Sequence, residues 1–206
     1  MNAILALEDG TWYKGIAIGA NGVASGEVVF NTSMTGYQEV LTDPSYAGQL
    51  VTMTAPQIGN YGVSPADEES RAPRVAGFIV REASPISSNW RAQSTLQDYF
   101  VQHNIVAIAD IDTRALTRVL RVAGVMRGVI ATGNTDPLEL VERAKEIPRM
   151  EGADLVREVT CETPYEWSEL GPSHGELENV SFGIKPETRA RKPRRVAAYD
   201  FGIKYN

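Results

Sequence analysis

Residues 3–30 read AILALEDGTWYKGIAIGANGVASGEVVF, and this stretch decides the fold class. Its short apolar runs are separated by two pairs, Asp9-Gly10 and Asn21-Gly22, which favour tight turns between antiparallel strands. The first pair predicts a hairpin at the N-terminus. The second predicts another hairpin that joins residues 16–18 to residues 27–30. Together they indicate a β-meander, and hence a β-rich fold.

Further along the chain, more short apolar runs have the length of strands. Residues 49–54 alternate polar and apolar side chains, as a half-buried strand does. Residues 75–81, 105–109 and 126–131 are nearly continuous apolar runs, which are typical of strands buried on both faces.

Three helices are predicted from the residues that begin them. Ser94 and Gln97 have the spacing of a capping box, and Asp112 or Thr113 can cap a helix that runs to Ala123. Asp136 precedes a proline at the first position of the third helix. The side chains expected to face the core are Leu96, Tyr99, Phe100, Leu116, Val119, Leu120, Leu138, Val141, Ala144 and Ile147. The first 150 residues therefore indicate an α+β fold.

The composition changes after residue 159. Residues 160–188 hold six Glu, one Lys and three Pro, and residues 189–195 then hold five basic side chains. Such a stretch is typical of an extended linker. Residues 196–199 again have the pattern of a strand. We therefore expect a domain at 1–159, a linker at 160–195, and the first strand of a truncated second domain at 196–206.

Composition and charge exclude several classes of protein. The 206 residues are 43% hydrophobic and 22% charged, and 20 Lys and Arg against 26 Asp and Glu give a net charge of −6. This balance argues against chain-wide binding to nucleic acid or to anionic membranes. One Cys and two His exclude a disulfide framework and a four-ligand zinc site. Without a signal peptide or a long apolar run, we expect a soluble, cytoplasmic protein.

Two loops are rich in hydroxyl groups, amides and glycines. Residues 31–49 contain the tripeptide Asp43-Pro44-Ser45, and residues 58–62 read IGNYG. Short donors and close backbone approach are what a ligand-lining loop requires. The same residues are also those of ordinary turns, because Asp and Ser side chains bond their own backbone. The sequence leaves both interpretations open.

Charged residues around 110–121 offer two weaker hypotheses. Asp110 and Asp112 are a candidate metal pair for an independent small-molecule enzyme, although Asp112 has an immediate use as a helix cap. Arg114, Arg118 and Arg121 share one helical face. That face suits an acidic partner or a phosphate, and it equally suits a solvated surface.

The remaining chemistry-bearing residues give no site. A nucleophilic Cys needs a base or a helix N-terminus, and nothing in the sequence places His103 or His174 beside Cys161. The basic run at 189–195 lacks interleaved aromatic residues, which argues against nucleic acid and for a linker resting on an acidic surface.

Several longer strings resemble one family. GEVVFNTSMTGYQEVLTDPSYAGQ (26–49) is similar to part of the small, glutamine-hydrolysing subunit of carbamoyl phosphate synthetase. The other matching strings are LEDGT (7–11), IGNYG (58–62), SNWR (88–91) and IADIDTRALTR (108–118). AYDFGIKYN (198–206) resembles the opening strand and turn of that family's second domain. The resemblance covers essentially the whole chain, in order.

The resemblance implies a swivelling β/β/α-type domain that packs on a large, ATP-using subunit, followed by a class I glutamine amidotransferase domain. In this family a Cys, activated by His and Glu, hydrolyses glutamine. Ammonia then passes through a tunnel to the large subunit. There ATP, magnesium and bicarbonate serve to make carbamoyl phosphate, a ligase reaction that feeds arginine and pyrimidine biosynthesis.

Carried over residue by residue, the resemblance places little of this chemistry in the present sequence. Ser45, in the Asp-Pro-Ser motif, is the expected glutamine contact. The catalytic Cys, His and Glu would lie beyond Asn206, and Cys161 falls in the variable linker. No catalytic residue, metal site or cofactor is expected in this chain, which alone should be inactive. The alternative is a stand-alone, non-catalytic module that binds the large subunit.

Overall fold

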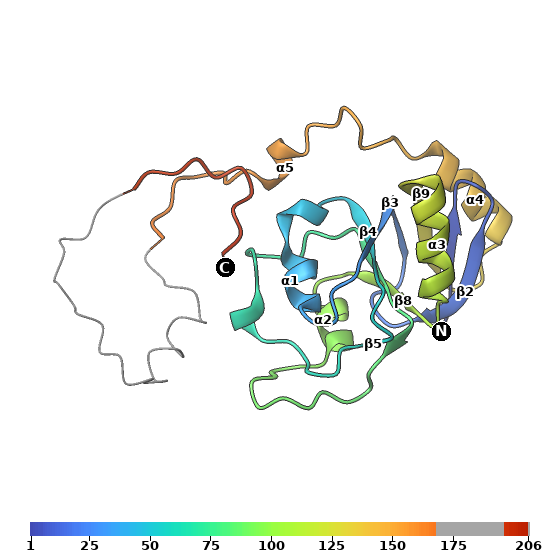
Figure 1. The fold of residues 1–206 in the computed structure, drawn as a ribbon, viewed down its shortest axis with the longest axis horizontal. Coiled ribbons are helices and arrows are strands. Elements are labelled where there is room, and N and C mark those ends of the chain that lie inside the picture. Colours follow the sequence, from blue (N-terminus) through green and yellow to red (C-terminus); the bar gives the residue numbers. More distant parts are fainter. Residues whose placement is uncertain (168–195, 206) are drawn as a thin grey trace.

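The computed structural model describes residues 1–167 and 196–205, and its centre is a closed barrel of seven strands (Figure 1). The order around the barrel is β1-β2-β8-β6-β4-β3-β9, and β9 returns to pair with β1. Neighbours from β3 to β8 run parallel, and the other pairs are antiparallel. The strands are β1 (Asn2–Leu7), β2 (Trp12–Ala17), β3 (Val23–Asn31), β4 (Gln49–Met53), β6 (Gly77–Ile79), β8 (Val106–Ala109) and β9 (Met126–Thr132).

Smaller elements surround the barrel. A two-stranded parallel sheet pairs β5 (Gln57–Ile58) with β7 (Glu82–Ala83). The α-helices are α1 (Tyr37–Thr42), α2 (Leu96–Gln102), α3 (Thr113–Ala123), α4 (Pro137–Glu146) and α5 (Val156–Val159), and single 3₁₀ turns occupy Pro44–Tyr46 and Pro65–Asp67. The mixed α+β composition is confirmed. No helix in the two described segments is long and apolar enough to cross a membrane.

Only the first predicted hairpin forms. β1 and β2 pair across the Asp9-Gly10 turn, where the Asp9 carboxylate accepts a hydrogen bond from the amide of Thr11 at 2.8 Å. The meander prediction is wrong at Asn21-Gly22, because β2 pairs with β8 while β3 pairs with β9 and β4. The chain after β2 stays beside β8 before it crosses to β9, so long-range pairing overrides a local turn signal.

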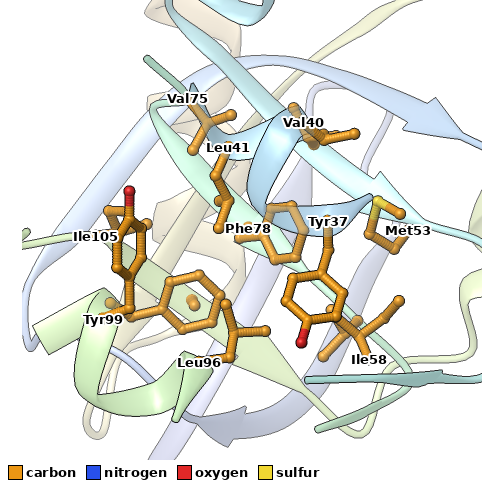
Figure 2. Close-up of a cluster of buried hydrophobic side chains, with 14 of the residues drawn as sticks. Tyr37, Val40, Leu41, Met53, Ile58, Val75, Phe78, Leu96, Tyr99 and Ile105 are labelled. Atoms are coloured by element: carbon orange, nitrogen blue, oxygen red, sulfur yellow. The ribbon is translucent and has the colours of Figure 1, made fainter. Parts of the chain in front are cut away.

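The barrel wall separates an inner from an outer set of apolar side chains. Inside lies a cluster to which α3 contributes Leu116 and Leu120. Since the wall is closed, α3 reaches this cluster from an open end of the barrel. Outside, α1 and α2 cover β4, β6 and β8 (Figure 2). The helix α4 covers β1 and β9. The inner cluster comprises Ala3, Leu5, Leu7, Ala24, Val28, Leu50, Ile79, Val106, Ile108, Ile111, Leu116, Leu120, Met126 and Ile130.

These layers test the predicted burial of the strands. β6, β8 and β9 are buried on both faces, as predicted. β4 was expected to be half-buried and is not, because helices cover its outer face as well. The interior has little spare room. A Cβ atom on Gly128 would lie 2.5 Å from a methyl group of Val28, so this position requires glycine.

Two predicted helix starts are confirmed and one is shifted. Asp112 caps α3 and Asp136 caps α4, each through its side-chain oxygen. In α2 the cap is Thr95, which accepts from the amide of Asp98; the capping box assigned to Ser94 and Gln97 is wrong. The carbonyl of Ser94 instead accepts a hydrogen bond from the amide of Val63.

The predicted core face of α4 is partly wrong. Leu138 is 68% exposed, whereas Leu140 is buried together with Val141 and Ala144. The helix is therefore rotated relative to the sequence interpretation. Its neighbours on β1 and β9, which the sequence does not reveal, select Leu140 as the inward residue.

A charged contact ties β1, β9 and the end of α4 together. The Glu8 carboxylate accepts from the Arg127 backbone amide at 2.9 Å and from two guanidinium nitrogens at 2.6 and 2.9 Å. A further guanidinium nitrogen donates to the carbonyl of Ile147 at 2.7 Å. The hydrogen bond from the Arg127 side chain outweighs partial burial and holds the pKa of Glu8 below its usual value.

Because the folded-state pKa of Glu8 is lowered, its contribution is present above the unfolded pKa and disappears as the pH falls through the folded pKa. We predict that Glu8→Gln reduces the free energy of unfolding by about 1–2 kcal/mol at pH 7 and by little at pH 3. Urea unfolding at both pH values measures this. Glu142→Gln is the control, because the exposed Glu142–Lys145 pair should contribute under about 0.5 kcal/mol. An equal loss at both pH values would contradict the prediction.

Two fully buried threonines form a matched pair. The Thr52 hydroxyl has no hydrogen-bond partner among the described residues, whereas the Thr42 hydroxyl donates to the carbonyl of Gln38 and accepts from the amide of Glu69. We predict that Thr52→Val stabilises the fold by about 1 kcal/mol and that Thr42→Val destabilises it by about 1–3 kcal/mol. Thermal unfolding should show shifts of opposite sign. Two shifts of the same sign would contradict this assignment of the hydroxyls.

Candidate functional site

Asp43-Pro44-Ser45 forms a single 3₁₀ turn between α1 and β4. One Asp43 carboxylate oxygen accepts a hydrogen bond from the amide of Ser45 at 2.8 Å, so the aspartate orders its own turn. The residue Ser45 is exposed, while Asp43 and Pro44 are buried. The turn interpretation of this tripeptide is therefore confirmed, and the turn presents Ser45 at the surface.

The loop around residues 58–62 holds the start of α1. The helix begins after Gly36, which has a left-handed backbone (φ 82°) and provides no side-chain cap. The Tyr61 hydroxyl takes the place of the cap, because it accepts hydrogen bonds from the amides of Gly36 at 2.6 Å and Tyr37 at 3.2 Å. The two tyrosine rings stack with centroids 4.2 Å apart, and the Tyr37 hydroxyl donates to the carbonyl of Gly62 at 2.6 Å. The two candidate loops are thus brought together.

Burial raises the pKa of both tyrosines, so their hydroxyls remain protonated under ordinary conditions. Each can therefore act as a neutral donor and acceptor. The ring of Tyr37 also packs into the apolar cluster beneath α1 (Figure 2). This helix of six residues depends on these tertiary contacts, because so short a helix is not stable alone.

The segment at 69–74 fixes the other end of α1. The Thr42 hydroxyl accepts from the amide of Glu69 at 2.8 Å, and the carbonyl of Thr42 accepts from the Ser70 hydroxyl at 2.6 Å. The carbonyl of Leu41 accepts from the amide of Arg74 at 2.8 Å. The last carbonyls of the helix are therefore satisfied, and Asp43 starts from a fixed position.

The segment at 196–205 lies against the same turn. Lys204 forms an ion pair of 2.6 Å with the second carboxylate oxygen of Asp43, and the amide of Tyr205 donates to the carbonyl of Glu69 at 3.0 Å. Burial would raise the pKa of Asp43, but the Lys204 ammonium and the Ser45 amide outweigh it and hold that pKa below its usual value. The same contact raises the pKa of Lys204. Asp43 therefore links the C-terminal segment to the turn that carries Ser45.

A cavity of about 250 Å³ lies beside this contact. The Asp200 carboxylate accepts from the Tyr165 hydroxyl at 2.6 Å and from the amides of Gly202 and Ile203 at 2.8 Å. These hydrogen bonds lower the pKa of Asp200 and raise the pKa of Tyr165 to about 12. The cavity also has Pro44 and the half-buried Cys161 in its lining. Ser45 lies next to Pro44 in the chain but outside this lining.

The structure does not assemble the histidines with Cys161. His103 ends α2 and lines a separate cavity of about 120 Å³. Its ring contacts the Tyr99 ring in a tilted arrangement, with centroids 4.3 Å apart. His174 and the basic run at 189–195 lie outside the described residues. Residues 196–199 form no strand, so that expectation of a second domain is not confirmed.

The other charged candidates take different places. Asp112 serves as the cap of α3, as the cap interpretation predicted. Within residues 1–167 and 196–205, no group of three His, Cys, Asp or Glu side chains is arranged to hold a metal ion. Arg114, Arg118 and Arg121 all lie exposed on α3.

Sequence reasoning missed four residues that build the site: Tyr37, Tyr61, Thr42 and Lys204. The tyrosines lie in the strings 26–49 and 58–62, but the sequence interpretation takes residues 37–42 as part of a loop. No local pattern joins Lys204 to Asp43, because the two residues lie at opposite ends of the chain. Only the fold shows this contact.

Comparison with known proteins shows the family of this chain. Residues 5–130 match the family model described as carbamoyl-phosphate synthase small chain, CPSase domain. The chain is 55% identical to a carbamoyl phosphate synthase small chain of Syntrophotalea carbinolica, over 100% of this chain and 53% of the relative. The small chain of Thermosynechococcus vestitus is 50% identical, over 99% of this chain and 52% of the relative.

The small chain of Vibrio vulnificus is 49% identical over 100% of this chain and 53% of the relative, so the chain spans about half the length of these curated relatives. The matches to these relatives extend over the turn, the helix and the C-terminal segment described above. The family model covers more than half of the sequence, up to residue 130. The chain belongs to the carbamoyl-phosphate synthase small chain family.

Proposed function

We propose that this chain is the N-terminal part of a glutamine-dependent carbamoyl phosphate synthase, a ligase, and that it forms one side of the glutamine cleft. The observation that carries this proposal is the Lys204–Asp43 ion pair at 2.6 Å. It brings the segment that resembles the start of an amidotransferase domain onto the turn that holds Ser45. A cleft between two domains requires that a segment of the second domain lies close to the turn that holds Ser45.

The geometry suits Ser45 for contact with a substrate. Ser45 is exposed on a turn that the Asp43 carboxylate orders, and its side chain also forms a hydrogen bond with that carboxylate, so the hydroxyl is oriented at the surface. A serine hydroxyl can donate to and accept from the polar groups of glutamine. Its role would be to bind and orient the substrate, because nothing described beside it activates it as a nucleophile.

The division of the chain follows from this assignment. Residues 1–159 would form the synthase domain, 160–195 the linker, and 196–206 the start of the amidotransferase domain. Hydrolysis of glutamine would use a Cys, His and Glu in the rest of the small chain. ATP, magnesium and bicarbonate would be bound by the large subunit, which would receive the ammonia. The product would serve arginine and pyrimidine biosynthesis in the cytoplasm.

We predict that Ser45→Ala in the full-length small chain raises the KM for glutamine about tenfold and leaves ammonia-dependent synthesis unchanged. The loss of one hydrogen bond to a polar substrate accounts for this size of effect. Steady-state kinetics with the assembled enzyme, using glutamine and then ammonium chloride, measures both. Ser88→Ala is the matched control, because Ser88 is also exposed but lies in another loop.

An unchanged KM for glutamine would contradict the role of Ser45. The proposed function as a whole would be contradicted by the behaviour of the wild-type chain described next. If the full-length wild-type chain bound the large subunit but hydrolysed no glutamine, the alternative of a non-catalytic interaction module would hold instead.

A further inference from the structure

The outer face of α3 carries charges that the fold itself does not use. Arg114, Arg118 and Arg121 are exposed, and none of the three forms an ion pair with another described residue. They fall on the side of the helix opposite Leu116 and Leu120, which point into the barrel. By contrast, Arg127, just beyond the helix, is fully engaged by Glu8.

Helix stability does not explain this arrangement. Like charges at four-residue spacing, such as Arg114 and Arg118, repel each other on a helix surface. Arg114 also lies in the first turn, where the positive end of the helix dipole disfavours a cation. No acidic residue lies between Thr113 and Arg127 to offset these charges. The exposed face of α4 differs, because there Lys145 pairs with Glu142 at 2.7 Å.

Exposed apolar side chains continue the same face. Val122 follows Arg118 by four residues and is 90% exposed, and Val125, just past the helix, is 57% exposed. The row Arg114, Arg118 and Val122 therefore runs along one side of α3, with Arg121 beside it. We call Arg114, Arg118, Arg121, Val122 and Val125 the α3 face. Arginine beside exposed aliphatic side chains is typical of protein interfaces, since guanidinium groups are more easily desolvated than ammonium groups.

The combination of positive charge and exposed valines on the α3 face indicates the kind of partner that it fits. The chain as a whole carries a net charge of −6, so the unpaired arginines are a local positive patch on an acidic protein. A phosphate ligand would neutralise the arginines but leave the valines in water. A protein surface that carries carboxylates beside apolar side chains would cover both. Charge complementarity therefore favours a protein partner.

We infer that the α3 face docks on an acidic, partly apolar surface of the large synthase subunit. This inference rests on the proposed function, which supplies such a subunit. α3 closes one end of the barrel, and its outer face is turned away from the interior cluster to which Leu116 and Leu120 belong. The turn at Ser45 belongs to the outer layer, because its neighbour Tyr46 packs against the cluster that includes α1.

The test measures binding of the full-length small chain to the separately purified large subunit by calorimetry. Arg118→Glu/Arg121→Glu should weaken binding at least about tenfold, because reversal places like charges across the interface. The wild-type affinity should fall as salt rises, and the variant should lose most of that dependence. Arg118→Lys/Arg121→Lys, which keeps the charge, should stay within about threefold of the wild type. Thermal unfolding of each variant checks the fold.

Arg143→Glu/Arg149→Glu is the matched control, because it makes the same change in net charge at two exposed arginines elsewhere. Binding of this control should stay within about threefold of the wild type. Normal binding by Arg118→Glu/Arg121→Glu would overturn the inference, and so would an equal loss in the control. Saturable binding of inorganic phosphate that is lost in the variant, with subunit binding intact, would also overturn it.

Different results would contradict the proposed function and the assignment of the α3 face. If the wild-type small chain does not bind the large subunit at all, both the proposed function and this inference are wrong. If the wild type binds and supports glutamine-dependent synthesis while the reversed variant does the same, only the α3 face is wrongly assigned.

Discussion

The rest of the structure depends on the pairing of β9 between β1 and β3, which closes the barrel. β9 pairs along its length with both strands, so the last strand of the barrel holds the first one in place. Closure removes exposed sheet edges and divides the apolar side chains into an inner and an outer set. The Glu8–Arg127 contact lies where this closure begins, and it also reaches the end of α4. Every covering helix is positioned by that wall.

The turn that carries Ser45 is positioned by helix α1, which packs on the barrel wall. α1 is too short to be stable on its own, and both of its ends are satisfied from outside: Tyr61 caps the start, and the segment at 69–74 binds the last carbonyls. α1 lies on the outer face of the parallel strands β4 and β6 (Figure 2). The turn is ordered locally by Asp43, whereas its place on the barrel is set by several distant segments.

This explains what the sequence could and could not predict. Runs of apolar residues predicted β6, β8 and β9, and the side chains of Asp112 and Asp136 predicted where two helices begin, because each signal is local. The hairpin at Asn21-Gly22 failed because strand pairing in a closed barrel is set over long distances. The prediction that Leu138 faces the core is wrong because the strands that α4 packs on are also distant in the sequence. The role of Ser45 comes from family resemblance alone, and the Asp43–Lys204 contact has no local signal at all.

Asp43 has two carboxylate oxygens and divides them between two tasks. One orders the Ser45 turn, and the other binds Lys204 from the C-terminal segment. Because both contacts act on one carboxylate, movement of the C-terminal segment would remove the Lys204 charge from beside the turn. The backbone of the turn would still be held by the Asp43–Ser45 hydrogen bond. If the proposed cleft exists, this carboxylate would join its two sides through an ionic contact. That arrangement suits a site whose second half is carried by another domain.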